Sequence, residues 1–398
     1  MPHHFTARRT HGFTESVIRG MTRLATEHGA INLAQGFPNF APPEVVTEAA
    51  VRAIRDGVNQ YAVTWGSARL RAAVAASWAA WYGQEVDPDR EVTITCGATE
   101  AMAAVFLACL NPDDEVLIFE PFYENFGPDA ILCGATPVFV PFPVDGVLDL
   151  DRVQAALTPK TRAIVLNTPN NPTGRVLTRD ELSGIATLCI GNDLLAITDE
   201  IYEHIVFDGE HVPMATLPSM RERTITVSGA SKTLSVTGWR VGTIMAPAAI
   251  TEAIRKVHDF LTVGAPAPLQ EGVAVGLETL GPDFYQDLAD GYRARRDLLI
   301  GGLQRAGFRC TPPQGAYYVL ADFRGLSRES DVSFARRLTG ECGVAPVPGS
   351  SFYHAPDLGR HVVRFAFCKT HDMLEAAITR LADLPTLLGR SREPEVPC

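Results

Sequence analysis

Short β-branched and apolar runs alternate with helix-like stretches from about Val51 onward. Each run is bounded by Gly, Pro, Asn or Asp, and the predicted strands are 91–97, 114–121, 136–142, 161–167, 193–200 and 223–229. Helical spacing is found in 98–110 and in 178–190, where Thr178 is a candidate N-cap. This alternation is typical of a mostly parallel sheet covered by helices, whose active sites lie beyond the carboxyl ends of the strands.

The pattern changes in the last third of the chain. Residues 284–307 predict one long amphipathic helix, and short strands around 316–323 and 361–367 and a final helix near 372–384 follow it. A chain of 398 residues also exceeds the size at which one core usually keeps growing. We therefore expect three parts: an N-terminal segment at 1–48 that packs with the small domain, a large domain at 49–282, and a small α+β domain at 283–398.

Composition narrows the class of protein. With 46% hydrophobic residues, 20% charged residues and no apolar run near 18 residues, the sequence predicts a globular protein without a membrane span. The N-terminus has no apolar signal region, so a cytoplasmic location is expected. A net charge of −11 argues against a nucleic-acid partner. Eight scattered cysteines without CxxC pairs or histidine partners predict neither disulfides nor a metal site.

Only four lysines occur in the sequence. Lys160 is expected in a surface turn, Lys256 on an amphipathic helix and Lys369 at a strand end that faces solvent. Lys232 instead follows the predicted strand 223–229 in a loop of small residues. A lysine there can be desolvated, which makes its amine nucleophilic at neutral pH, as Schiff-base chemistry requires. An isolated lysine is more often solvated, so the neighbouring strand ends decide between these interpretations.

Two neighbouring strand ends carry groups that a pyridoxal phosphate ring needs. In "LLAITDEIYEH", Asp199 or Glu200 lies at the carboxyl rim, where a carboxylate favours the protonated form of a pyridine nitrogen. An amide or the Tyr202 hydroxyl can donate to the phenolate oxygen of the ring. The candidate amides in "NTPNNPTG" belong to Asn167, Asn170 and Asn171. Alone, each of these motifs is commonly an ordinary turn.

A phosphate site is expected where the strand 91–97 gives way to a helix. Gly97, Ala98 and Thr99 open that helix, and its free amides and positive dipole end suit a phosphate. Arg240 follows Lys232 by eight residues and supplies a balancing cation with bidentate geometry. The combination of these strand ends indicates a pyridoxal phosphate site.

The ordered motifs resemble those of class I and II aminotransferases, which are fold type I pyridoxal phosphate enzymes. The resemblance is strongest to the branch of kynurenine aminotransferases, glutamine transaminase K and methionine aminotransferases. It covers nearly the whole chain, through "INLAQGFPNF", "NQYAVTWGSARLR", "EPFYENF", "NTPNNPTG", "ITDEIYEH", "SGASKTLSVTGWRVG", "PQGAYYVLADF" and "VVRFAF". It implies a large domain with a mostly parallel seven-stranded sheet covered by helices, plus a smaller α+β domain.

The resemblance also implies catalytic roles for matched residues. Lys232 binds the cofactor as an imine and later moves the proton between the substrate Cα and the cofactor C4′ carbon. Asp199 pairs with the pyridinium nitrogen. Asn171 and Tyr202 bond the phenolate oxygen, and Tyr123 stacks on the ring.

Further residues are implied to bind the phosphate and the substrate. Gly97, Ala98, Thr99 and Arg240 hold the phosphate. Arg364 clamps the substrate α-carboxylate, as does Asn171 in part, and Gly36 lets the backbone approach the substrate. Without the resemblance, Arg364 reads as a surface salt bridge. Tyr61 reaches the phosphate from a partner subunit, so a homodimer with shared active sites is implied.

The sequence departs from the family pattern at three places. Gly229 stands where a serine commonly bonds the phosphate, and Ser228 or Ser231 is expected to compensate. Val263 and Gly264 stand where the kynurenine branch often has an aromatic residue and a histidine, which predicts a roomier pocket. Asn39 replaces a common acidic residue, which removes a charge near the entrance.

The leading hypothesis is an aminotransferase that moves the amino group of an L-amino acid to a 2-oxo acid by a ping-pong mechanism. Expected donors have medium-sized neutral side chains, such as Met, Gln or aromatic residues. The alternative is a pyridoxal phosphate enzyme for β- or γ-elimination or replacement, either a carbon–sulfur lyase or a biosynthetic enzyme for a methionine- or S-adenosylmethionine-like substrate. A binding module without chemistry predicts loss of Lys232 or Asp199, and both are present.

Overall fold

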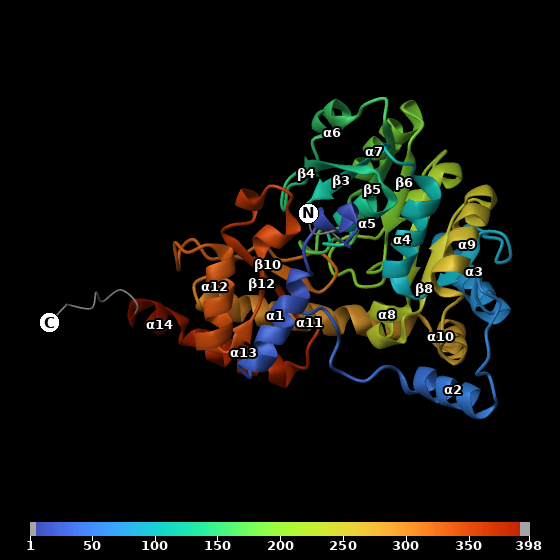
Figure 1. Cartoon of the computed structure of the whole chain (residues 1–398). Coiled ribbons are helices and arrows are strands. Elements are labelled where there is room, and N and C mark those ends of the chain that lie inside the picture. The colour runs from blue at the N-terminus through green and yellow to red at the C-terminus, as the bar shows by residue number, and fades with distance from the viewer. Residues whose placement is uncertain (1–4, 391–398) are drawn as a thin grey trace.

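The computed structural model describes residues 5–390, and a seven-stranded sheet forms its centre (Figure 1). The strand order is β2-β8-β7-β6-β5-β3-β4. The strands are β2 (Val92–Thr95), β3 (Glu115–Glu120), β4 (Thr136–Pro141), β5 (Thr161–Asn167), β6 (Leu195–Asp199), β7 (Thr224–Gly229) and β8 (Gly242–Met245). Strand β8 runs antiparallel to β2 and β7, whereas the other paired strands are parallel.

All six strands predicted from the run pattern are present, and the mostly parallel seven-stranded sheet is confirmed. The pattern did not single out β8. This strand reads GTIM and contains two β-branched residues, whereas the equally short β2 reads VTIT and is β-branched throughout.

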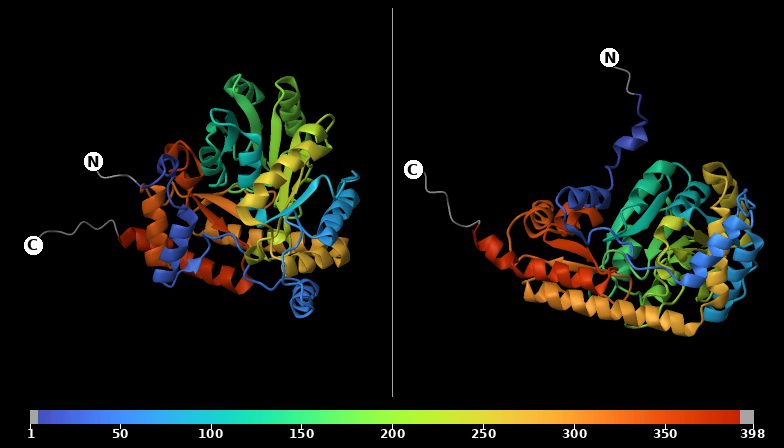
Figure 2. Two further views of the ribbon diagram at one scale, coloured as in Figure 1. Left: turned by 45° about the vertical axis from the view of Figure 1, so that its right-hand side comes forward. Right: turned by 90° about the horizontal axis from the view of Figure 1, so that it is seen from below.

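Helices cover both faces of the large sheet (Figures 1 and 2). They are α2 (Glu44–Arg55), α3 (Ala68–Tyr82), α4 (Gly97–Cys109), α5 (Phe126–Cys133), α6 (Leu150–Ala156), α7 (Arg179–Gly191), α8 (Ala230–Thr233), α9 (Ala248–Thr262) and α10 (Ala267–Thr279). Successive residues of β3 enter opposite cores. Val116 and Ile118 pack in the core with α4, and Leu117 and Phe119 pack in the core with α7. The strand is therefore apolar throughout, as burial on both faces requires.

The predicted N-cap of α7 is confirmed. The Thr178 side chain accepts from the Glu181 amide, and the Glu181 carboxylate accepts from the Thr178 amide, which together form a capping box. No helix within residues 5–390 is long and apolar enough to cross a membrane.

The C-terminal part contains a four-stranded antiparallel sheet of order β12-β13-β10-β9. Its elements are α11 (Pro282–Arg305), β9 (Arg309–Cys310), β10 (Tyr318–Asp322), α12 (Asp331–Arg337), β11 (Val344–Ala345), β12 (Val347–Pro348), β13 (Val362–Ala366), α13 (His371–Ala382) and α14 (Leu384–Arg390). The N-terminal helix α1 (Val17–Glu27) packs here, and β1 (Ile31–Asn32) pairs with β11. Helix α11 runs along this part and onward to α3, where Tyr285 contacts Trp81 (Figure 2). The exact domain boundaries remain predictions.

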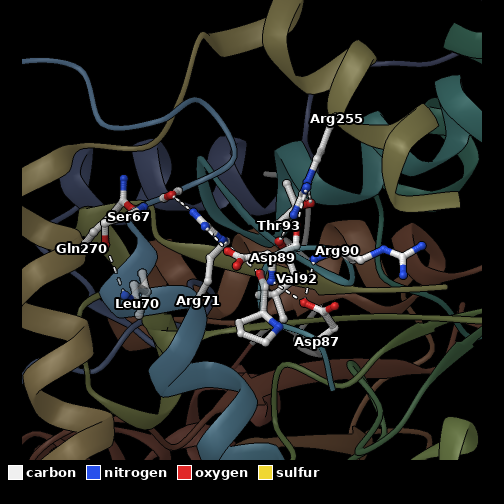
Figure 3. Close-up of polar contacts among 12 residues, drawn as sticks. Ser67, Leu70, Arg71, Asp87, Asp89, Arg90, Val92, Thr93, Arg255 and Gln270 are labelled. Carbon is white, nitrogen blue, oxygen red and sulfur yellow. Dashed lines mark hydrogen bonds and ion pairs between the residues drawn. The ribbon is translucent and has the colours of Figure 1, made fainter. Parts of the chain in front are cut away.

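A polar network fixes the edge strand β2 (Figure 3). Arg71 of α3 donates to the Asp89 carboxylate at 2.7 Å. Arg255 of α9 donates to the Val92 carbonyl at 2.6 Å and to the Thr93 hydroxyl at 3.2 Å. Because β2 leads into α4, this network sets the position of the first turn of α4.

Candidate active site

A cavity of about 460 Å³ lies beyond the carboxyl ends of β5, β6 and β7, beside the first turn of α4. Eleven of the predicted site residues line it: Gly36, Ala98, Thr99, Tyr123, Asn171, Asp199, Tyr202, Ser231, Lys232, Arg240 and Arg364. A larger surface cavity of about 590 Å³ lies elsewhere, between residues 144–150 and 311–314, and none of the predicted residues line it. The structure therefore brings most of the predicted site together in one place.

Lys232 lies in α8, directly after β7, and its side chain points to the cavity. Its Nζ donates to the Gly36 carbonyl at 3.3 Å and lies 5.9 Å from the Tyr202 ring centroid. Burial lowers the pKa of Lys232 to about 8, and the Arg240 cation acts in the same direction. Part of the lysine population is therefore a neutral amine near neutral pH, as a nucleophile requires.

Asp199 ends β6 and is 6% exposed. Burial raises the pKa of Asp199 to about 7, because the ionised carboxylate loses hydration, and the hydrogen bond from the Ile201 amide at 3.2 Å offsets only part of this effect. Glu200, the other candidate, does not line the cavity and instead bonds His211 at 3.0 Å. Asp199 is thus the carboxylate that can stabilise a cation inside the cavity.

The three candidate asparagines have different partners. Asn171 lines the cavity, and its Oδ1 accepts from Arg364 at 2.7 Å. Asn167 Oδ1 accepts from the Asn171 amide at 2.7 Å, and Asn170 Oδ1 accepts from the Thr173 hydroxyl at 2.8 Å. Asn167 and Asn170 therefore shape the loop, and Asn171 presents its side chain to the cavity.

Arg364 of β13 is fully buried, and the structure records no carboxylate partner for it in residues 5–390. Its Nη2 donates to the Ala34 carbonyl at 2.5 Å, and its guanidinium carbon lies 4.2 Å from the Tyr318 ring centroid. The Arg364 Nε is buried without a hydrogen-bond partner among the described residues. A buried guanidinium with a free donor suits a carboxylate ligand, so the surface salt-bridge interpretation is wrong.

Tyr202 and Tyr318 form a hydroxyl pair in the cavity wall. Their oxygens lie 3.0 Å apart, and burial raises the pKa of both phenols above the ordinary value. A Cβ added to Gly36 would lie 1.9 Å from the Tyr318 hydroxyl. Gly36 therefore lets the backbone approach Tyr318, and its predicted role toward the substrate stays a prediction. No sequence signal singled out Tyr318.

The first turn of α4 forms a cradle with Arg240. A Cβ added to Gly97 would lie 2.4 Å from Arg240 Nη2, so only a glycine leaves room for the guanidinium. Ala98 and Thr99 line the cavity next to it. The N-cap residue Cys96 makes no side-chain capping bond, which leaves these amides available for an anion.

The end of β7 explains the missing serine. A Cβ added to Gly229 would lie 2.8 Å from the Gly242 Cα, so a serine does not fit there. Ser231 lines the cavity, as expected. The prediction for Ser228 needs correction, because its hydroxyl donates to the Glu203 carboxylate at 2.5 Å and does not line the cavity. Successive residues of a strand point to opposite faces of the sheet, and the Ser228 side chain points to the face away from the cavity.

Besides Gly97 and Ser228, four residues singled out from the sequence do not line the cavity of their own chain. Tyr61 is 86% exposed, and its role across a subunit interface stays a prediction. Val263 is 45% exposed and Gly264 lies against Thr64, so neither enlarges this cavity. Asn39 does not line the cavity, because its Oδ1 accepts from the Thr370 amide at 2.7 Å, at the start of α13.

The expectation that Lys369 faces solvent is wrong. It is 1% exposed, and its Nζ donates to the carbonyls of Gln35 and Phe37 at 3.2 and 2.8 Å. These partners lie more than 330 residues away in sequence, so no local pattern reveals the contact.

The N-terminal segment supplies cavity residues that the sequence did not identify. Ser16, Ile18 and Arg19 line the cavity from the start of α1. The Ser16 hydroxyl donates to the Glu124 carboxylate, which also lines the cavity. Their only sequence signal is membership of an amphipathic helix, which does not distinguish a cavity wall from a core contact.

Comparisons with known proteins give similarity to aminotransferases over most of the chain. A family model described as "Aminotransferase class I and II" matches residues 28–381. The chain is 37% identical to the methionine aminotransferase of Escherichia coli, over 93% of this chain and 96% of that protein. It is 35% identical to the kynurenine–oxoglutarate transaminase of Dictyostelium discoideum, over 95% of this chain and 96% of that protein. The solved structure of N-succinyldiaminopimelate aminotransferase from Mycobacterium tuberculosis superposes with a TM-score of 0.93 at 42% identity, covering 95% of this chain and 100% of that chain.

Proposed function

The chain belongs to the class I and II aminotransferases, a pyridoxal phosphate-dependent family that acts on amino acids and 2-oxo acids, and we propose that this cavity binds the cofactor and performs the transfer. One observation carries the proposal: Lys232, Asp199 and Arg364 line one cavity, each buried or partly buried without an oppositely charged side-chain partner. A nucleophile, a carboxylate and a guanidinium in this state suit a charged ligand that satisfies all three.

The described residues fit pyridoxal phosphate. The cradle of Ala98, Thr99 and Arg240 suits the phosphate, and Ser231 lies beside it. Asp199 suits the ring nitrogen, and Tyr202 and Asn171 suit the phenolate oxygen. When bound, the cofactor supplies an electron sink for the charge that develops at the substrate Cα.

The residues of the chain divide the remaining work. Arg364 holds the substrate carboxylate with two parallel hydrogen bonds, which fixes the Cα–H bond relative to the ring. The Lys232 amine would take up the proton that leaves the substrate Cα and hold it for its return, a role that its lowered pKa favours. The Tyr202–Tyr318 pair and buried Asn171 keep bulk water from this face of the cavity.

Donors with medium-sized neutral side chains, such as Met, Gln and aromatic residues, fit the cavity best. Ile18, Phe37 and Met102 give it apolar walls, and Gln35 and Asn125 add neutral polar groups. An activity matrix of L-amino acids and 2-oxo acids tests this proposal. Formation of a new amino acid from the added 2-oxo acid supports transamination. Ammonia with pyruvate or 2-oxobutyrate, formed without an acceptor, would show the elimination chemistry that the relatives do not favour.

A donor whose side chain ends in a carboxylate is a second candidate. Arg19 lines the cavity mouth, and no hydrogen bond or ion pair of its guanidinium is found within residues 5–390. One relative is named for N-succinyldiaminopimelate, a donor with distal carboxylates. The same matrix should include this donor and glutamate, and Arg19→Gln should raise the KM for these two donors and leave the KM for methionine unchanged.

A homodimer with shared active sites is part of the proposal. Tyr61 is 86% exposed, and the exposed apolar side chains of Phe260 and Val263 accompany it. Apolar side chains exposed in one chain commonly mark an interface. Mixing inactive Tyr61→Ala and Lys232→Ala variants tests sharing, because hybrid dimers then contain one site with both native residues. Recovery of activity on mixing supports shared sites, and a mixture that stays inactive argues against them.

A further inference from the structure

Four consecutive carbonyls, those of residues 34–37, accept hydrogen bonds from side chains. We call this segment the carbonyl loop. The donors are Arg364 to Ala34 (2.5 Å), Lys369 to Gln35 (3.2 Å) and to Phe37 (2.8 Å), and Lys232 and Tyr317 to Gly36 (3.3 and 3.0 Å). Three of these four donors are cations. The loop is therefore held against the cavity mainly by cationic side chains.

Lys369 differs from the other two cations in its surroundings. Lys232 and Arg364 line the cavity, whereas Lys369 does not. The Lys369 ammonium is buried, lies 3.8 Å from the Phe37 ring centroid, and has no ion pair among the described residues. Burial lowers the pKa of Lys369. The carbonyls of Gln35 and Phe37 and the face of the Phe37 ring offset the hydration that the Lys369 ammonium loses. All of these partners belong to the carbonyl loop, so the buried ammonium binds this loop specifically.

The reaction recruits two of the three cations. Lys232 must leave Gly36 to serve the cofactor and substrate, and Arg364 must turn part of its fork to a substrate carboxylate. From this we propose that Lys369 is a positioning residue, which keeps the carbonyl loop in place while Lys232 and Arg364 change partners. The inference rests on the proposed function for its catalytic consequence, but the anchoring itself is a property of the chain.

Displacement of the loop would reach the substrate site through Gly36. Gly36 packs against the Tyr318 hydroxyl, and that hydroxyl bonds Tyr202 at 3.0 Å. Arg364 stacks on the Tyr318 ring. A shift of the loop therefore reaches Arg364, which would hold the substrate, both directly and through Tyr318, and reaches the cofactor side only through the bond between Tyr318 and Tyr202.

The variant Lys369→Met tests the proposal, with Lys160→Met as a matched control. Lys160 is an exposed lysine in a turn far from the loop in sequence. Hydrogen exchange of a peptide that covers residues 31–41 should quicken in the holoenzyme of Lys369→Met and stay unchanged in the control. The KM for the amino acid should rise about tenfold, since a small misplacement of a positioning group has such an effect, while kcat changes less than about threefold. Lys369→Arg keeps a cation with several donors and should recover most of both losses.

Native-like exchange at 31–41 in folded Lys369→Met would overturn the anchoring role. Equal losses in KM and kcat, or a loss that Lys369→Arg does not recover, would overturn the positioning role. If Lys369→Met does not fold, Lys369→Gln replaces it in both measurements, with the same expected results. A wild-type enzyme that transaminates no donor would instead refute the proposed function, and the exchange comparison would still decide the anchoring.

Discussion

The cavity has two walls that are held in place by different interactions. The cofactor wall consists of strand ends, and its side chains are placed by backbone pairing: Asp199 lies in register with Asn167 in the β5–β6 ladder. The substrate wall includes the carbonyl loop, whose carbonyls accept hydrogen bonds from the cationic side chains of Arg364 and Lys369. A backbone ladder does not depend on the charge of a ligand, whereas the cations of the second wall are shared with the reaction. We therefore expect the first wall to be preformed and the second wall to change when a charged ligand binds.

The largest effect is expected where both walls meet, at Lys232. Lys232→Ala should remove the visible absorbance of the bound cofactor and lower the rate of transfer by more than about 10³-fold. The control is Lys256→Ala, because Lys256 is exposed and pairs with Glu252. This variant should leave the absorbance and the rate of transfer unchanged. Retention of the absorbance in purified Lys232→Ala would contradict the central assignment.

A variant of Arg364 tests whether the two walls act independently. Arg364→Gln should raise the KM for the amino acid by about 10²- to 10³-fold, because a buried charge pair with the substrate carboxylate is lost. The affinity for pyridoxal phosphate, measured by titration of the apoprotein, should change less than about threefold, because strand ends hold the cofactor. A parallel loss of both affinities would show that the two walls form a single unit.

The cofactor wall was the more predictable of the two from sequence. Strands buried on both faces, such as β5, are continuous apolar runs, and the groups that follow them converge because parallel strands end at one edge. Lys232 was found in this way, whereas Asp199 and Asn171 were selected by the resemblance to the family, because the pattern left Glu200 and two other asparagines open. Alternation along β7 accounts for Ser228, which points away from the site, whereas Ser231 lies in α8 beyond the end of the strand and its place in the cavity wall appears only in the structure.

The substrate wall depends on contacts that no local pattern contains. Lys369 reads as a solvent-facing strand end, and its burial appears only when residues 35–37 pack against it. Arg19 and Ser16 lie on a helix whose spacing indicates only one apolar face. Hydrogen bonds from side chains to loop carbonyls leave no periodic pattern in the sequence, so the contacts of this wall could be identified only in the structure.

Asp199 links the cofactor wall to pH. Its ordinary pKa of 3.8 is raised to about 7 by burial, so the folded apoprotein binds a proton between these values that the unfolded chain has released. The apoprotein therefore loses stability through this group as pH rises from about 4 to about 7, and the cost stays constant above. Asp199→Asn cannot ionise and should stabilise the apoprotein at pH 8, by on the order of 1–4 kcal/mol.

Urea unfolding of the apoproteins at pH 5 and pH 8 measures this difference, which should fall to roughly a third at pH 5, because about one of the roughly three pH units between the two pKa values has then been crossed. With pyridoxal phosphate bound, the order should reverse, because only the ionised Asp199 pairs with a cationic ring nitrogen. A stabilisation that is equal at both pH values would contradict the assignment to this carboxylate.

The smallest effect is expected at the network that braces β2, outside the cavity (Figure 3). The Arg71 guanidinium donates to the Asp89 carboxylate and to the carbonyls of Pro88 and Gly66. Arg71→Met leaves the Gly66 and Pro88 carbonyls without this donor and removes the ion pair with the exposed Asp89, so it should lower the free energy of unfolding by about 1–3 kcal/mol. The first turn of α4 follows β2, so any functional loss should appear in the affinity for pyridoxal phosphate and not in the KM for the amino acid. Lys369→Met should show the opposite pattern, and the pair of variants would then assign each wall to its own ligand.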